Sequence, residues 1–197
     1  MHYDIAIVGY GPVGAAAASM FGKKGFNTVV IEPKKDIWDI PRAVHFDGQV
    51  QRVYQSMGIS SEVEKIIDIM TGITFLNHKG NKIVSLNMNN APRKNSYHED
   101  VMFDQPKFER ILRNHAEKNK NIDFKIGSYV SKLDPRESGN LLEIFDTNTN
   151  KISEISASYV IGADGADSFV RKSTKIKSKD FKEDEDWIVV DYLVDDN

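Results

Sequence analysis

A glycine-rich turn between an apolar run and an alanine-rich segment constrains the fold of this chain more than any other feature. Residues 3–8 are mostly apolar, as is typical of a buried parallel strand. The turn over residues 9–14 interrupts that pattern, and residues 13–24 have the composition of a helix. A β-rich run follows at residues 28–31. These segments predict a strand–helix–strand unit at the start of the chain.

The glycines of this turn have the spacing GxGxxG, and each has its own physical role in that pattern. Gly9 allows the tight turn after the strand, and Gly11 allows a pyrophosphate to approach the backbone. Gly14 allows the helix to pack closely against the strand, and Pro12 suits the first helical turn. Unpaired N–H groups at the helix N-terminus favour a bound anion. The turn therefore predicts a dinucleotide-binding site.

An acidic residue at the end of the second β-rich run completes the pattern. Glu32 follows Gly14 by 18 residues, close to the spacing of about 20 that is typical of dinucleotide sites. Its carboxylate can accept hydrogen bonds from a ribose diol and would repel a 2′-phosphate, which disfavours NADP at this site. The alternative interpretation is a glycine-rich turn beside a surface acid, with no ligand.

Periodicity and turn residues predict the elements of the rest of the chain. Asp104 is placed to cap a helix, Ser61 and Glu64 have the spacing of a capping box, and the charged segment 171–186 is expected to be linker or surface. We expect helices at residues 50–57 and 105–119, a hairpin of strands 73–76 and 83–86, and strands at 122–126, 129–133, 141–146, 151–155, 159–161 and 187–194.

The composition excludes several classes of function. A net charge of −3 gives no electrostatic reason to expect a nucleic-acid partner. The chain has no cysteine, which excludes disulfides, thiolate metal sites and cysteine nucleophiles. No apolar run has membrane-spanning length and the first residues do not resemble a signal peptide, so we expect a cytoplasmic protein with no membrane partner. The histidines lack metal-ligand spacing, and we expect no metal site.

Four segments occur in an order that resembles a known family. They are the GxGxxG turn, residues 41–44, residues 104–106 with the helix after them, and the Gly-Ala-Asp-Gly segment with its trailing serine and arginine at 162–171. Together they resemble the FAD-dependent aromatic-ring monooxygenases of the p-hydroxybenzoate hydroxylase type, nearest the hydroxyphenylpropionate and phenol hydroxylase branch. The resemblance spans nearly the whole chain. It implies FAD as cofactor, NAD(P)H as co-substrate, and hydroxylation of a phenolic substrate with O2.

The resemblance also implies roles for individual residues. The glycines of the turn would contact the FAD pyrophosphate and Glu32 the adenosine ribose. Arg42 would help to hold the phosphates, Gln105 would bond the middle of the cofactor, and the backbone of Val130 would lie near the adenine. Asp164 would serve both the pyrophosphate and the incoming nicotinamide nucleotide. No catalytic acid or base is implied. The full set of expected cofactor-binding residues is Gly9, Gly11, Pro12, Val13, Gly14, Glu32, Pro33, Arg42, Gln105, Val130, Asp164 and Gly165.

Several of these residues also have an interpretation without a ligand. Arg42 follows a proline in a predicted loop and could be a solvated charge. Gln105 could cap the helix that it starts, and Asp164 could be a turn former. The position of Asp164 after a core strand favours the binding interpretation, because ligands bind beyond strand C-termini in such sheets. His45 is interpreted as polar surface.

The expected fold is α/β, with a Rossmann-like FAD-binding domain, a β insertion of three or more strands and an incomplete substrate-domain sheet. The FAD-binding domain would comprise residues 1–72 and 99–175, and the partial sheet residues 73–98 and 186–197. Strand 187–194 would expose unpaired backbone groups unless the hairpin, a second copy of the chain or further polypeptide covers it. We therefore expect a fragment of a longer protein. The alternatives are another FAD- or NAD-dependent oxidoreductase, or a truncated, non-catalytic FAD-binding module.

Overall fold

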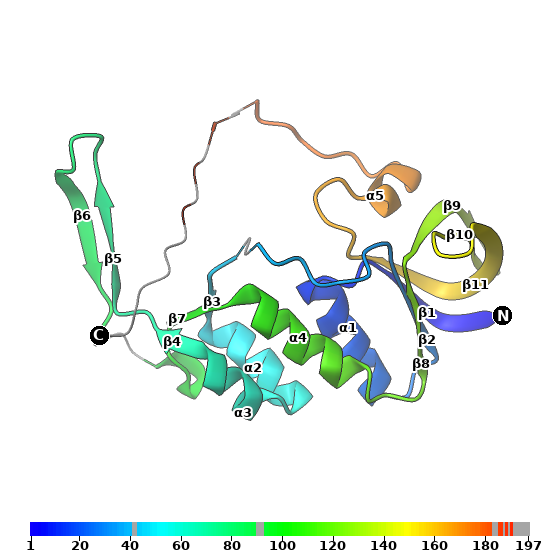
Figure 1. Ribbon diagram of the computed structural model, residues 1–197, viewed down its shortest axis with the longest axis horizontal. Helices are drawn as coiled ribbons and strands as arrows, with labels where there is room; N and C mark the ends of the chain where they lie inside the picture. The colour runs from blue at the N-terminus through cyan, green and yellow to red at the C-terminus, as the bar shows by residue number, and fades with distance from the viewer. Residues whose placement is uncertain (41–42, 90–92, 183–184, 187, 189, 191–197) are drawn as a thin grey trace.

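The computed structural model describes residues 1–40, 43–89, 93–182, 185–186, 188 and 190. Its centre is a six-stranded sheet with the strand order β8-β2-β1-β11-β10-β9 (Figure 1). The first four of these strands run parallel, and β9, β10 and β11 are antiparallel to their neighbours in the second half of the sheet. The six strands are β1 His2–Val8, β2 Thr28–Glu32, β8 Ile122–Ile126, β9 Ser128–Arg136, β10 Gly139–Asp146 and β11 Lys151–Gly162. The predicted α/β class is confirmed.

Strand β11 joins the two halves of the sheet. Its first part pairs with β10 and its second part with β1, so Ala157 lies between Asn140 and Tyr3. Two separate strands were predicted here, which is wrong: β11 is one strand of 12 residues. The strand continues through Ser156 and Ser158 because its backbone pairs with β10 up to Ala157 and with β1 from Ser156 onward.

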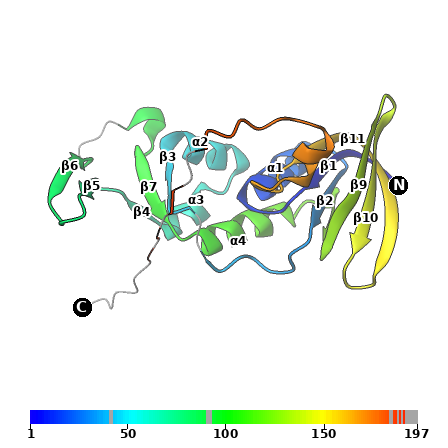
Figure 2. The same ribbon diagram turned by 90° about the horizontal axis from the view of Figure 1, so that it is seen from above.

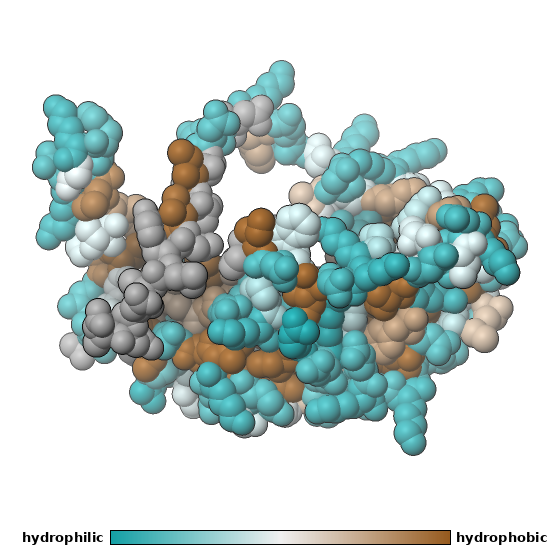
Figure 3. Space-filling view, in the orientation of Figure 1, coloured by the Kyte–Doolittle hydropathy of each residue, from teal (hydrophilic) through white to brown (hydrophobic). Residues whose placement is uncertain are grey.

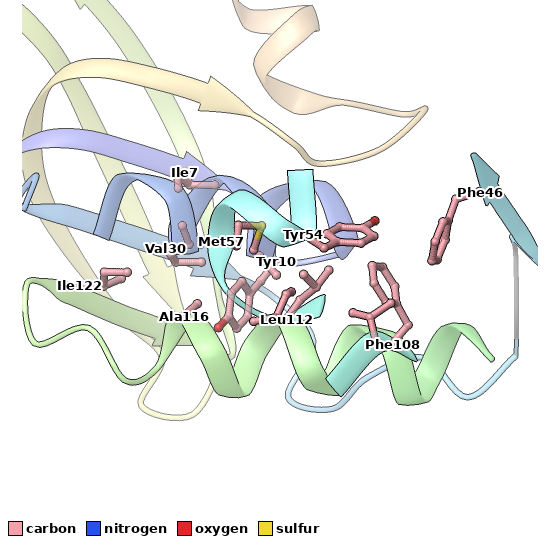
Figure 4. Close-up of a cluster of buried hydrophobic side chains, with 14 of the residues drawn as sticks. Ile7, Tyr10, Val30, Phe46, Tyr54, Met57, Phe108, Leu112, Ala116 and Ile122 are labelled. Atoms are coloured by element: carbon pink, nitrogen blue, oxygen red, sulfur yellow. The ribbon is translucent and has the colours of Figure 1, made fainter. Parts of the chain in front are cut away.

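Two helices cover one face of the parallel strands. Helix α1 (Pro12–Lys23) follows the glycine turn, and α4 (Gln105–Ala116) packs beside it. Both helices were predicted from the sequence. Asp104 caps α4 by accepting a hydrogen bond of 3.1 Å from the N–H of Lys107, which confirms its predicted role. Side chains of the two helices meet those of the strands in a continuous core, which includes Ile7, Tyr10, Val30, Leu112, Ala116 and Ile122 (Figure 4).

The antiparallel strands bend over the face of the parallel strands that α1 and α4 do not cover. Figure 2 shows β9, β10 and β11 stacked at one end of the molecule. Val130 and Leu142 pack there in one buried cluster with Ile31. A short helix, α5 (Phe169–Ser173), packs on the same face through Val170. The sequence predicted linker or surface from residue 171 onward, but residues 171–173 belong to this helix, whose N-terminus is capped by the hydroxyl of Ser168.

A smaller unit lies at the end of α4 that is distant from the six-stranded sheet (Figure 1). It contains the predicted helix α2 (Gly48–Met57), which ends at Gly58 with a φ of 88°. The capping box predicted at Ser61 is wrong, since Ser61 bonds the Glu62 carboxylate and the chain soon turns into a strand. The other elements of this unit are β3 His45–Asp47, α3 Ser60–Val63, η1 Glu64–Ile66, β4 Ile67–Ile69, η2 Lys94–Ser96 and β7 Asp100–Phe103.

The predicted hairpin is present as β5 (Gly72–Leu76) and β6 (Lys82–Asn87). It projects from the rest of the molecule, and every residue of both strands is exposed (Figures 1 and 3). The predicted strand 187–194 lies outside the described residues except for Ile188 and Val190, which are exposed and not in a strand. None of the helices in the described part of the chain is long and apolar enough for a membrane span.

Candidate functional site

Two glycines of the first turn are required by the packing of the backbone. Gly9 has a φ of +100°, and a Cβ on it would collide with the carbonyl oxygen of Ala163 and lie 2.9 Å from the nitrogen of Asp164. A Cβ on Gly14 would collide with the carbonyl oxygen of Gly9. The first glycine turn therefore packs directly on the Gly-Ala-Asp-Gly segment, although the two are about 150 residues apart in the sequence.

The middle glycine has a different environment. A Cβ on Gly11 would meet no other atom within 4 Å, so packing within the chain does not require glycine there. Gly11 is the N-cap of α1 and its position has no side-chain cap, while its carbonyl accepts the N–H of Ala15 at 2.9 Å. The N-terminus of α1 thus presents backbone amides beside open space, which is the arrangement that favours a phosphate.

The carboxylate of Glu32 is buried and holds the turn in place. Its Oε2 accepts a hydrogen bond of 2.7 Å from the N–H of Tyr10, and its Oε1 accepts one of 2.8 Å from the N–H of Lys34. The side chain also lines the cleft described below. Glu32 therefore has a structural role in addition to the ribose contact that the sequence predicts, because it ties the end of β2 to the glycine turn.

Asp164 organises the second turn. Its two oxygens accept hydrogen bonds from the hydroxyl of Ser168, at 2.6 Å, and from the N–H of Val170, at 3.1 Å. Gly165, the next residue, has a φ of +82°. Asp164 and Gly165 both line the cleft, so the turn-forming interpretation is correct and does not exclude a ligand role.

Gln105 is buried at the start of α4 and is not the helix cap. Its Oε1 accepts a hydrogen bond of 2.9 Å from the N–H of Ala43, while Asp104 provides the cap. The contact ties the loop after β2 to α4. Arg42, next to Ala43, lies outside the described residues, so its predicted contact with the phosphates stays a prediction.

These segments enclose a cleft of about 830 Å³ at the C-terminal ends of the parallel strands. That volume is within the range of small-molecule sites, and the position is the one at which ligands bind in such sheets. Apart from Gly14, which is buried behind Gly9, and Arg42, every residue of the predicted set lines the cleft: Gly9, Gly11, Pro12, Val13, Glu32, Pro33, Gln105, Val130, Asp164 and Gly165.

The cleft also has walls that the sequence analysis did not identify. Lys34 and Trp38 line it, with the ammonium of Lys34 4.0 Å from the ring centroid of Trp38. In its wall, Arg113 and Glu109 form an ion pair of 2.7 Å. The i,i+4 spacing of these two residues on a predicted helix signals the pair, but nothing in the sequence shows that it is buried.

The remaining titratable groups near the cleft do not form a metal site. Burial raises the pKa of the Tyr10 hydroxyl, which donates a 3.2 Å hydrogen bond to the carbonyl oxygen of Arg113. His45 lies 3.6 Å from Asp100 and does not line the cleft. No group of three or more histidine, aspartate or glutamate side chains among the described residues could hold a metal ion.

The chain is similar to known FAD-dependent proteins in sequence. Residues 2–197 match the family model described as FAD binding domain. Over 190 residues the chain is 30% identical to a 3-(3-hydroxy-phenyl)propionate/3-hydroxycinnamic acid hydroxylase of Paraburkholderia xenovorans, covering 95% of this chain and 30% of the relative. It is 26% identical to a probable NADH-specific resorcinol 4-hydroxylase of Rhodococcus jostii, covering 96% and 36%. The chain thus spans about a third of the length of these relatives.

Solved structures share the fold. The flavin-dependent monooxygenase PieE, crystallised with FAD and substrate, superposes with a TM-score of 0.80 at 22% identity, over 89% of this chain and 32% of that one. The p-nitrophenol 4-monooxygenase PnpA of Pseudomonas putida gives a TM-score of 0.79 at 22% identity, over 87% and 43%. At this level of identity, the likeness concerns the arrangement of helices and strands.

Proposed function

The chain belongs to the FAD binding domain family, and on that premise we propose that its cleft binds FAD through the ADP half. The observation that carries the proposal is the environment of Gly11. The site at Gly11 is open, lies at an N-terminus that no side chain caps, and borders a cleft of about 830 Å³. A glycine that packing does not require is explained if a pyrophosphate approaches the backbone there.

The other residues of the cleft have matching roles. The amides at the start of α1 would bond the pyrophosphate, with Arg42 as an additional cation. Glu32 uses one lone pair of each oxygen within the chain, which leaves further acceptor capacity for the ribose hydroxyls. Gln105 would face the middle of the cofactor, Val130 the adenine, and Asp164 the pyrophosphate side of the cleft.

The activity of the whole protein is part of the proposal. The relatives named above hydroxylate phenolic compounds, and one is described as NADH-specific. We propose that the complete protein is an FAD-dependent monooxygenase that hydroxylates a phenolic substrate with NAD(P)H and O2. When bound, FAD would supply the redox chemistry, and the residues of this chain would bind it, orient it and exclude water from it.

We also propose the division of the chain that the sequence suggests. Residues 1–72 and 99–175 would form the FAD-binding domain, and residues 73–98 and 186–197 would belong to a substrate-domain sheet. The exposed apolar side chains of the hairpin, among them Ile83 and Leu86, support this division because a covering sheet would bury them. A second copy of the chain is the other candidate cover. The proposed location is cytoplasmic, with no nucleic-acid partner.

Titration of the purified chain with FAD tests the binding proposal. Flavin fluorescence is followed as protein is added, and ADP is then used as a competitor. We expect saturable binding that ADP reverses, with weaker binding of NAD. A chain that binds NAD but not FAD would instead be a nicotinamide-dependent protein. Absence of binding to both would reject the proposed function. NADH oxidation with FAD and phenols then separates an enzyme from a non-catalytic module.

A further inference from the structure

The ion pair between Glu109 and Arg113 is unusually buried for two charged residues. Their side chains are 4% and 10% exposed, and both line the cleft from α4. Removing two charges from water costs free energy that their attraction does not reliably recover, so a buried pair is poor evidence of stability alone. Its presence in the cleft wall therefore calls for a role at the site.

Arg113 also contacts the glycine turn. Its guanidinium lies 4.6 Å from the ring centroid of Tyr10, and its carbonyl oxygen accepts the Tyr10 hydroxyl at 3.2 Å. Tyr10 is the residue between Gly9 and Gly11, and its ring is buried beside Leu112 of α4 (Figure 4). The side chain of Tyr10 thus anchors the turn to α4.

The backbone of Tyr10 is held from the other side. Its N–H donates to Glu32 at 2.7 Å, while Gly9 packs on the backbone of Ala163. The turn is therefore fixed at three points: by the carboxylate of Glu32, by the backbone of Ala163 and by Arg113 of α4. The Nε of Arg113 is buried and has no partner in the described part of the chain.

We propose that Arg113 is a cofactor-positioning residue that acts through Tyr10. Its guanidinium is paired with Glu109 and lies over the Tyr10 ring, and through that ring it holds the backbone of the turn at the position where the FAD pyrophosphate binds. A lysine could keep the charge beside Glu109 but could not reproduce the contact of a guanidinium with the ring or its fork of N–H donors. The inference rests on the proposed function, since it concerns the affinity of the same cleft for FAD.

A double-mutant cycle on FAD affinity tests this inference. The dissociation constant is measured by flavin fluorescence for the unaltered chain, for Arg113→Lys, for Tyr10→Leu and for the double variant. We expect each single change to weaken FAD binding about tenfold, and the double variant to bind no more weakly than either single one. Arg110→Lys serves as the control, because Arg110 is exposed on the same helix and should retain full affinity.

The outcomes separate the possible roles. Unchanged affinity in Arg113→Lys would overturn the inference while leaving the proposed function intact. Losses that multiply in the double variant would indicate a direct contact between Arg113 and the ligand, and would also overturn it. Absence of FAD binding by the unaltered chain would reject the proposed function itself.

A second variant tests whether weaker FAD binding results only from loss of folding. Replacing the pair by Glu109→Leu with Arg113→Met leaves no unpaired buried charge and keeps a similar volume. We expect it to fold, as judged by circular dichroism, and to show the same weakened FAD binding as Arg113→Lys. If neither Arg113→Lys nor the Glu109→Leu, Arg113→Met variant folds, the ion pair is needed for stability, and the inference is overturned.

Discussion

Glu32 Oε2 and the backbone nitrogen of Tyr10 are 2.7 Å apart, although 22 residues separate them in the sequence. The bond connects the end of β2 to the middle of the glycine turn. Glu32 Oε1 makes a second bond, to the N–H of Lys34, so both oxygens of one buried carboxylate accept from backbone donors. The acid that the sequence associates with a ribose therefore also shapes the turn that would face the pyrophosphate.

Replacing this acid by its amide should lower stability. In Glu32→Gln the NH₂ group must face one of the two backbone N–H donors, since a carboxamide has only one acceptor oxygen. Leaving a buried donor without an acceptor costs about 1–3 kcal/mol. We expect the free energy of unfolding in urea to fall by that amount. Glu137→Gln is the matched control, because Glu137 is exposed; equal stability of the two variants would contradict the argument.

Alanine at the three glycines should separate stability from binding. Gly9→Ala and Gly14→Ala force a Cβ into backbone atoms, and Gly9 also has a left-handed φ. We expect each to lose at least about 2 kcal/mol of stability. Gly11→Ala meets no atom of the chain and should unfold at nearly the same urea concentration as the unaltered chain, yet bind FAD about tenfold more weakly. Normal FAD affinity in Gly11→Ala would argue against a pyrophosphate at this position.

The sequence predicted the elements whose signals are local. An apolar run before the glycines and an alanine-rich run after them are enough to predict β1 and α1, and short spacing connects both to Glu32. The residues of these motifs reach the same cleft because the carboxyl ends of parallel strands lie along one edge of a sheet. Most of the candidate site could be predicted for that reason.

The elements that the sequence missed depend on distant partners. Strands β3 and β4 have three residues each and exist through pairing with β7, which lies more than 30 residues further along the chain. The contact of Arg113 with Tyr10 was missed for the same reason, because the packing of α4 against the turn is a tertiary property. Side-chain spacing on a helix shows which residues are neighbours, not what lies over them.

The short helix α5 should depend on its cap. The hydroxyl of Ser168 accepts the N–H of Arg171 at 3.0 Å and donates to Asp164 at 2.6 Å. Ser168→Ala removes both bonds and should cost about 1 kcal/mol. We expect faster amide hydrogen exchange in α5, with α1 and α4 unchanged. Ser178→Ala, at an exposed position, should leave exchange in α5 as it was; equal protection in both variants would mean that Val170 packing alone holds the helix.

The stability of the chain should fall as pH decreases below about 6.5, because of His115. Burial lowers the pKa of this histidine below its ordinary value of 6.5, Lys118 and Lys23 lower it further, and Glu62 opposes them. Its Nδ1 also lies 2.6 Å from the Ser19 hydroxyl, between α4 and α1. The unfolded chain therefore binds the proton more tightly than the folded chain, so the stabilisation is complete above pH 6.5 and is lost as pH falls through the lowered pKa.

Urea unfolding at a series of pH values measures this slope, and a pair of histidine variants isolates its source. His115→Gln should flatten the dependence between pH 7.5 and 5.5, because the group that takes up the proton on unfolding is gone. His78→Gln removes an exposed histidine and should leave the slope unchanged. Both variants keep every carboxylate, whose titration lies mainly at lower pH. A slope that persists in His115→Gln would mean that another group takes up the proton, and that the partly buried contact between His115 and Ser19 is tolerated in both charge states.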